Sequence, residues 1–203
     1  MKTVYLVRHA QSQPSHEVEE PSWPLSDRGR AQATRLVEVL EPLGIQKVHT
    51  SPYLRCRDTI APFVAATKVP VQVHDDLRER KVASTVVDNF VDIWQRSWDD
   101  FGFAMPGCES SDSAQRRIHS EVLQICDGAQ DDALAISSHG NVLALLLNRL
   151  DPKFHIEQAT AMRNPEIIRL AYADGALSWD AGWAMPALDR FASHYSETPL
   201  PNK

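Results

Sequence analysis

The chain has 203 residues, of which 43% are hydrophobic and 24% are charged, and its formal net charge is −6 at pH 7. This composition supplies enough apolar material for one domain with a real core, and it argues against intrinsic disorder. It also argues against a nucleic-acid partner, since such domains usually present a basic face, whereas a small anionic ligand needs only a local arginine cluster.

Cellular location and membrane association can be judged from a few features. Cys56, Cys108 and Cys126 are odd in number and show no C-x-x-C spacing, so we expect reduced thiols in a cytoplasmic protein. Residues 1–9 are too short, and become charged too early, for a signal peptide. Histidine and asparagine interrupt the longest apolar run, residues 133–150, so we expect no membrane partner. The oligomeric state stays open.

The first part of the chain alternates strand-like and helical patterns. Residues 3–10 are rich in β-branched and aromatic side chains, typical of a buried parallel strand, and a polar loop with three prolines follows. Ser26 can cap a helix that Gly44 ends. The other elements expected here are a strand over 47–51, a helix over 53–67 that is interrupted or kinked at Pro62, and a strand over 69–77.

The rest of the chain continues this alternation. An apolar stripe at helical spacing predicts a helix over residues 84–98, inside a cap-like insertion at about 81–108. We expect the aromatic side chains of this insertion to pack the cap rather than line a pocket. From Ser196 onward we expect a loose tail. The other expected elements are helices over 111–126 and 141–150, a strand over 131–140, and a hairpin over 166–173 and 176–180.

Strands that alternate with helices predict an α/β fold, with a mainly parallel sheet and helices on both faces. The chain is interpreted as a single domain over residues 1–203. Ligands of such folds bind at the carboxyl ends of the strands. Polar groups fall at three of these ends: Arg8-His9 after the first strand, residues 51–55 after the second, and residues 138–140 after the fourth.

Arg8 and His9 place a permanent cation beside a titratable imidazole at the end of a buried strand. The pair alone could equally be two rim residues, but a second histidine, His139, occupies the matching place on another strand. Gly140 would let an anion approach the backbone, and the helix start behind it attracts negative charge. A simple helix cap by Ser138 would explain that motif if it stood alone.

Two further charged positions follow strands. Arg55 is expected to face inward because it lies at a strand end, and Arg57, two residues on, should then face elsewhere around a helix. Two solvated surface arginines are the alternative. Glu79 lies in a run of charged residues, and from spacing alone a solvated side chain is the better interpretation than a proton donor. No metal-binding, P-loop, dinucleotide-binding or Gly-x-Ser-x-Gly motif is present.

The motifs LVRHAQS, LSDRGRAQA, SPYLRCRDT, LRE, PGCES and SSHGN occur in this order. Together they resemble the histidine phosphatase superfamily of phosphoglycerate-mutase-like fold, and in particular its small phosphatases of bacterial type. The resemblance spans roughly residues 3–172. It implies a three-layer α/β/α sandwich that needs no metal and no cofactor.

The resemblance also implies residue roles. His9 would be the nucleophile that becomes phosphohistidine, while Arg8, Arg55 and His139 bind the phosphoryl oxygens. Glu79 would donate a proton to the leaving group. The substrate-binding positions that it implies are Gln11, Ser12, Ser15 (where the family often has Asn) and Gly140, through its backbone.

The implied activity is hydrolysis of a phosphomonoester, either a small phosphorylated metabolite or a phosphoprotein. A phosphoglycerate-type mutase would use the same residues, but the chain is short for the extra segments of such enzymes. A non-catalytic phospholigand binder on the same fold is the other alternative. The stretch KVASTVVDNF replaces a glycine-rich, Trp-containing segment of sugar-phosphate members, and Cys108 replaces a glycine, so the substrate stays open.

Overall fold

The sheet is the centre of the structure, a computed structural model that describes residues 1–15, 17–83 and 89–185. Its six strands have the order β3-β2-β4-β1-β5-β6. The first four strands in this order run parallel to one another, and β5 is antiparallel to both β1 and β6. The prediction of a mainly parallel sheet is confirmed. The strands are β1 Lys2–Arg8, β2 Lys47–Thr50, β3 Val71–Val73, β4 Ala133–Ser138, β5 Glu166–Ala173 and β6 Ala176–Trp179.

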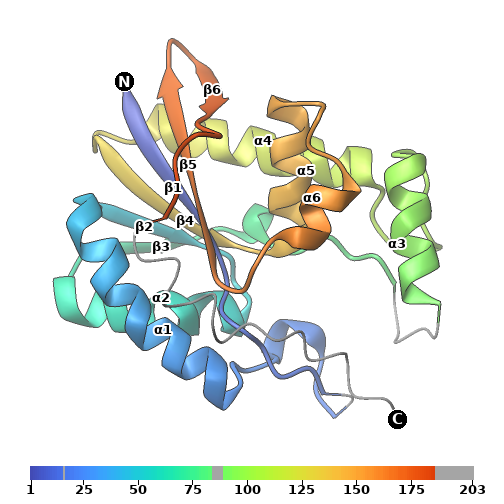
Figure 1. Ribbon diagram of the computed structural model, residues 1–203, viewed down its shortest axis with the longest axis horizontal. Helices are drawn as coiled ribbons and strands as arrows, with labels where there is room; N and C mark the ends of the chain where they lie inside the picture. The colour runs from blue at the N-terminus through green and yellow to red at the C-terminus, as the bar shows by residue number, and fades with distance from the viewer. Residues whose placement is uncertain (16, 84–88, 186–203) are drawn as a thin grey trace.

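Helices cover both faces of the sheet and complete the expected α/β/α sandwich (Figure 1). α1 and α2 pack on one face, and α4 and α5 pack on the other. α3, green in Figure 1, lies to the side, beyond α5 and α6 in this view. The helices of the described residues are α1 Asp27–Leu40, α2 Leu54–Thr67, α3 Phe90–Asp99, α4 Ser111–Gly128, α5 Gly140–Leu150 and α6 Ile156–Ala161, with 3-10 turns η1 Glu20–Ser22, η2 Glu41–Leu43 and η3 Asp75–Leu77.

Strand β1 is buried on both faces, as its sequence predicts. Val4 and Leu6 join the core beneath α4 and α5, while Tyr5 and Val7 join the core beneath α1 and α2. This division follows from the strand period of two, which sends successive side chains to opposite faces. The two apolar cores hold β1 firmly, so the residues at its carboxyl end have fixed positions.

The helix expected between Ser26 and Gly44 is confirmed. The Ser26 hydroxyl accepts a hydrogen bond from the Gly29 amide at 3.0 Å and so caps α1. α1 passes into η2, and the chain then reverses at Gly44, whose φ of 65° is left-handed. This helix therefore begins and ends where the local sequence signals place it.

Two expected elements differ from the structure. The strand predicted over 69–77 is confined to Val71–Val73, and η3 follows at once. Val71 and Val73 are 42% and 51% exposed, because β3 is an edge strand whose alternation does not mark a buried face. α2 is not interrupted at Pro62, and Ile60 and Phe63 keep its apolar face buried on both sides of the proline; a kink there stays a prediction.

Parts of two predictions lie outside the described residues. The helix predicted over 84–98 is seen from Phe90 to Asp99, and residues 84–88 are not among those described. The tail from Ser196 also lies outside them. The short helix α6 was not expected from the sequence. The interpretation of residues 1–203 as one domain with an insertion at about 81–108 stays a prediction.

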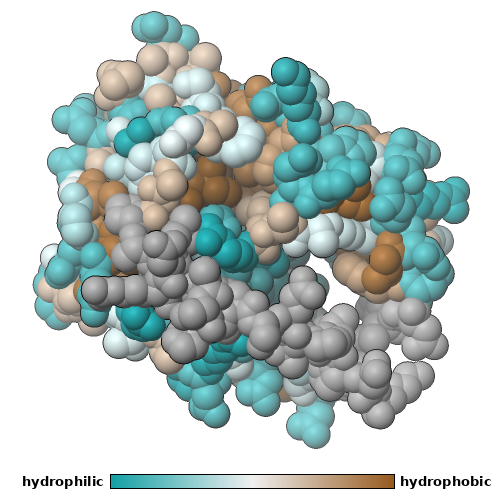
Figure 2. Space-filling model, in the orientation of Figure 1, coloured by the Kyte–Doolittle hydropathy of each residue, from teal (hydrophilic) through white to brown (hydrophobic). Residues whose placement is uncertain are grey.

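The surface mixes polar and apolar side chains, and the three cysteines differ in burial. Figure 2 shows one face, on which hydrophilic side chains are mixed with small apolar patches. Within residues 1–15, 17–83 and 89–185, no helix combines the length and the apolar character needed to cross a membrane. Cys56 and Cys126 are buried free thiols, and the side chain of Cys108 is half-buried.

The burial of β1 makes a prediction about stability. Val4→Ala should lower the free energy of unfolding by about 2 kcal/mol, because it removes buried methyl groups and leaves a cavity. Val73→Ala, the same change on exposed β3, should alter it by less than about 0.5 kcal/mol. Urea denaturation followed by circular dichroism measures both. Equal losses in the two variants would contradict this description of the core.

Candidate active site

Three strand ends meet at one edge of the sheet. The parallel register sets Arg8 of β1 beside Ser138 of β4, and Thr50 of β2 beside Ser137. The His9 amide donates to the Ser138 carbonyl at 3.1 Å, which continues this pairing past the end of β1. As a result, the rings of His9 and His139 lie 5.3 Å apart, centroid to centroid. The predicted convergence of the two histidines is confirmed.

His9 is held as one tautomer. Its Nδ1 lies 2.7 Å from the Ala10 carbonyl oxygen, and because a carbonyl only accepts, Nδ1 must carry the proton. Nε2 therefore has a free lone pair, toward which Arg55 Nε donates at 3.2 Å. Burial, followed by the charges of Arg55 and Arg8, holds the pKa of His9 well below its ordinary value. The imidazole is thus neutral, with a nucleophilic nitrogen at the site.

His139 lies fully buried beside it. Its Nε2 is 2.7 Å from the Ser51 hydroxyl, and Cys56 Sγ lies 3.4 Å from the same nitrogen. The pKa of His139 lies well below its ordinary value, first because the ring is buried and second because of the charge of Arg55. The residue is also the N-cap of α5, so the strand end and the helix start together fix its position.

Arg8 packs directly against the start of α5. A Cβ on Gly140 would lie 2.7 Å from Arg8 Cζ and 2.7 Å from its Nε, so only glycine allows this contact. Arg8 Nη1 donates to the Met162 carbonyl at 2.6 Å. Its Nε is buried without a hydrogen-bond partner among the described residues, so one charged donor is available to an anion at the site.

Arg55 faces inward and Arg57 is exposed, as helical spacing predicts. The helix that carries them begins at Leu54, two residues after Pro52. Thr59, one turn later, donates to the Arg55 carbonyl at 2.6 Å and accepts from the Ala10 amide at 2.9 Å. The backbones of the nucleophile loop and of α2 are therefore joined through one hydroxyl.

Glu79 is half-buried against the start of α5 and bound by backbone amides, so its interpretation as a solvated charge is wrong. Its carboxylate accepts from the amides of Arg80 at 2.9 Å, Val142 at 2.9 Å and Asn141 at 3.2 Å. Burial is the largest influence and raises the pKa of Glu79, although the Arg80 amide and the charge of Arg55 oppose it. The first amides of α5 therefore hold a carboxylate of the protein itself.

Arginines from neighbouring elements fix the segment that carries Glu79. Arg117 of α4 pairs with Glu109 through two nitrogens, at 2.9 and 2.7 Å, and donates to the Asp76 carbonyl at 2.6 Å. Arg80 donates to the Glu109 carbonyl at 2.9 Å and to the Ser97 hydroxyl at 2.8 Å. The segment that carries Glu79 is thus tied to Ser97 and Glu109 by these two arginines.

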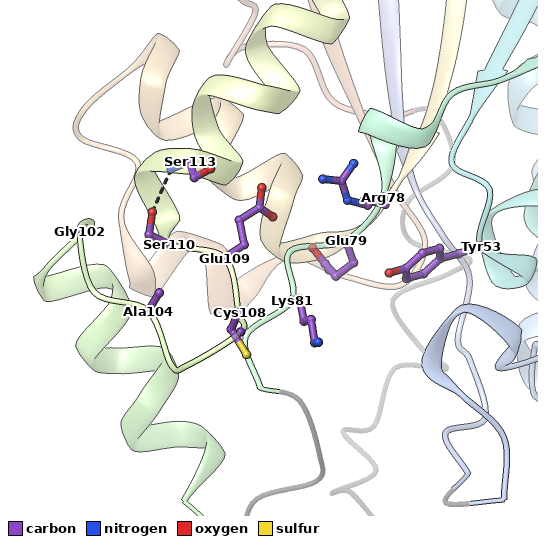
Figure 3. A pocket seen from close by; sticks show the side chains of 11 residues that line it. Tyr53, Arg78, Glu79, Lys81, Gly102, Ala104, Cys108, Glu109, Ser110 and Ser113 are labelled. Carbon is purple, nitrogen blue, oxygen red and sulfur yellow. Dashed lines mark hydrogen bonds between the residues drawn. The ribbon is translucent and has the colours of Figure 1, made fainter.

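A cavity of about 640 Å³ opens beside Glu79 (Figure 3). Glu79 and Tyr53 lie on one side of it, and Cys108, Glu109 and Ser110 lie across from them. Trp98 packs instead against Trp94 and Phe101, and none of the three lines the cavity, so for these residues the expected packing is confirmed, whereas Phe90 is 42% exposed. The lining residues are Tyr53, Arg78, Glu79, Lys81, Gly102, Ala104, Gly107, Cys108, Glu109, Ser110 and Ser113.

The predicted substrate-binding residues of the first loop make hydrogen bonds within that loop. The Gln11 side chain accepts from the Ser26 hydroxyl at 2.8 Å. Ser12 pairs with Leu25 in an isolated β-bridge. The Ser15 hydroxyl accepts from the Glu17 amide at 3.1 Å. Their role toward a substrate stays a prediction.

Several site residues were missed by sequence reasoning. The Asn164 amide group donates to the His9 carbonyl at 2.9 Å, and Glu20 pairs with Arg55 at 2.8 Å. Asn164 lies in an irregular segment and Glu20 in the short 3-10 turn η1, and neither carries a periodic signal. Ser51 belongs to the polar group at residues 51–55 that the sequence places at a strand end, but its contact with His139 was not expected. Among the described residues, no group of three or more His, Cys, Asp or Glu side chains is placed to hold a metal ion.

Comparison with known proteins shows the family to which this chain belongs. Residues 4–181 match the histidine phosphatase superfamily (branch 1). The chain belongs to this superfamily. The matched region begins in β1, before the first histidine, and includes both histidines and both arginines of the site. A probable phosphatase of Schizosaccharomyces pombe is 38% identical over 81 residues, which cover 38% of this chain and 39% of that protein.

Solved structures show the same fold. A mycobacterial glucosyl-3-phosphoglycerate phosphatase has a TM-score of 0.71 at 22% identity, covering 88% of this chain and 96% of its own. A phosphoserine phosphatase mutant from Entamoeba histolytica, in complex with phosphoserine, has a TM-score of 0.70 at 14% identity, covering 89% and 96%. At these identities the likeness establishes the phosphoglycerate-mutase-like fold.

The contact between Arg8 and α5 can be tested by adding one methyl group. Gly140→Ala should displace the Arg8 guanidinium and weaken the binding of inorganic phosphate about tenfold or more, as loss of a charged hydrogen bond predicts. Isothermal titration calorimetry measures this affinity. Gly128→Ala is the matched control, because its added Cβ would meet nothing within 4 Å. Unchanged binding in Gly140→Ala would remove Arg8 from the phosphate site.

Proposed function

We propose that the protein is a phosphomonoester hydrolase that acts through a phosphohistidine at His9. One observation carries this proposal. His9 is buried and neutral, and its unprotonated Nε2 lies 3.2 Å from Arg55 Nε. A neutral nucleophile avoids repulsion by the phosphate dianion, and the neighbouring arginines stabilise the charge that the transferring group carries.

In the first step, His9 Nε2 attacks phosphorus, the N–P bond forms, and the bond to the leaving oxygen breaks. Arg8 and Arg55 bind the phosphoryl oxygens through guanidinium donors, and His139 lies beside them as a further ligand. Glu79 gives its proton to the leaving oxygen, since its raised pKa favours the protonated form.

In the second step, water attacks the phosphohistidine. Glu79, now a carboxylate, takes a proton from that water, the N–P bond breaks, and inorganic phosphate leaves. The enzyme returns to neutral His9 and protonated Glu79. The helix-start amides that hold Glu79 keep it in the same place for both proton transfers.

The leaving group occupies the cavity beside Glu79 in this proposal. That cavity is lined by cations, carboxylates and serines, with Tyr53 as its single aromatic residue among those described, so a polar leaving group fits it. Two relatives of the same fold carry names for small phosphorylated metabolites. We therefore favour a small metabolite over a phosphoprotein. The mutase and the non-catalytic binder remain the alternatives to be tested.

His9 is tested first. His9→Ala should lose at least about a thousandfold in the rate of hydrolysis of p-nitrophenyl phosphate and of a panel of metabolite phosphates. An acid-labile phosphoenzyme should form in the wild type and not in the variant. His119→Ala is the control, because this histidine of α4 interacts with Arg149, at the opposite end of α5 from Gly140. A mild loss in His9→Ala would refute covalent catalysis, and faster isomerisation than hydrolysis of 3-phosphoglycerate would favour a mutase.

Glu79 is tested by changing the leaving group. Glu79→Gln should slow hydrolysis of an alkyl phosphate about 100-fold or more, because an alkoxide needs a proton to leave. The loss in kcat/KM, which reports only the steps up to formation of the phosphoenzyme, should be much smaller for p-nitrophenyl phosphate, whose phenolate leaves without a proton. The wild-type rate on the alkyl substrate should fall as pH rises through the raised pKa of Glu79, and this fall should be absent from the variant. Equal losses on both substrates would exclude Glu79 as the proton donor.

A further inference from the structure

Arg55 uses the two edges of its guanidinium for different partners. A guanidinium has a lateral edge, formed by Nε and Nη2, and a terminal edge, formed by Nη1 and Nη2. The terminal edge is bound by one residue: Nη1 donates to the Glu20 carbonyl at 2.9 Å and Nη2 to Glu20 Oε1 at 2.8 Å. Nε, on the lateral edge, donates to His9 Nε2 at 3.2 Å. Glu20 therefore binds Arg55 from the side away from the nucleophile.

The surroundings favour an ordered contact. The Arg55 side chain is 4% exposed and that of Glu20 is 36% exposed. The Tyr53 ring lies 4.9 Å from Arg55 Cζ, and the Trp23 ring lies 5.8 Å from it. Trp23 Nε1 donates to the Ser15 carbonyl at 3.0 Å, which ties down the loop that carries Glu20. Arginine has many rotamers, so such contacts decide which way its donors point.

We propose that Glu20 is a positioning residue, which holds the lateral edge of Arg55 in line with His9 Nε2 so that a phosphoryl group meets donors already aligned. The inference rests on the proposed function in taking phosphate as the ligand. It depends on the reach of the Glu20 side chain to Nη2 rather than on its charge. A carboxylate that merely occupied the phosphate position would act through charge and would compete with the ligand.

Three substitutions separate reach from charge. Glu20→Gln keeps the length and an accepting oxygen but removes the charge. Glu20→Asp keeps the charge but shortens the side chain by one methylene, and Glu20→Ala removes both. Glu19→Gln is the matched control, because Glu19 is the exposed neighbour and the charge change is identical. Each variant is measured by calorimetric binding of inorganic phosphate, by kcat and KM for p-nitrophenyl phosphate, and by thermal unfolding.

Positioning predicts that Glu20→Gln and Glu19→Gln bind phosphate at least as tightly as the wild type and keep kcat within about threefold. Glu20→Asp and Glu20→Ala should bind phosphate about tenfold more weakly and lose about tenfold in kcat, with unchanged thermal midpoints. The inference is overturned if Glu20→Asp behaves as wild type while Glu20→Gln fails, if all variants are equal, or if Glu20→Ala binds phosphate more tightly than the wild type.

Phosphate binding and turnover, measured together, also separate this inference from the proposed function. If the wild type shows no turnover but phosphate binding follows the predicted order of variants, hydrolysis is refuted and the role of Glu20 stands. If the wild type hydrolyses its substrates and the variants do not follow that order, hydrolysis stands and the role of Glu20 is refuted.

Discussion

The hydrogen bond from His9 Nδ1 to the Ala10 carbonyl is the interaction on which the site depends. It decides which ring nitrogen keeps a lone pair, and the roles of the other groups in the site depend on which nitrogen that is. Arg55 points at the unprotonated nitrogen, and burial, followed by the charges of Arg55 and Arg8, lowers the pKa of His9 and so disfavours a second proton on the ring. With the other tautomer, Nε2 would carry a proton toward Arg55, and two donors would face each other.

The sheet explains how groups so distant along the chain share this site. β1, β4 and β2 are adjacent and parallel, so their carboxyl ends open at one edge, and hydrogen bonds continue the pairing as far as His9 and Ser51. The apolar residues on both faces of β1 fix that edge from within. The proposed phosphoryl transfer depends mainly on reacting groups that are held in fixed positions. A strand buried on two faces holds them in this way.

Much of this arrangement could be predicted from the sequence, because it follows from periodicity. Strand ends located the two histidines, and helical spacing separated Arg55 from Arg57. Glu79 could not be placed in this way, since nothing in its charged run shows that the amides of α5 would receive it. The role of Glu20 also escaped prediction, because it depends on how an irregular loop folds back over α2. Local patterns thus locate regular elements, whereas contacts made by loops depend on tertiary packing.

Arg80, the residue after the proposed acid Glu79, connects that acid to the segment 89–110. Arg80 is buried between Ser97 of α3 and the backbone of Glu109, so the peptide that carries Glu79 is joined to the wall of the cavity beside it. A change in the length or packing of that wall would therefore move the acid as well as the pocket. In this protein, divergence toward a new substrate would be expected to alter the acidity profile of the reaction at the same time, and the two traits would evolve together.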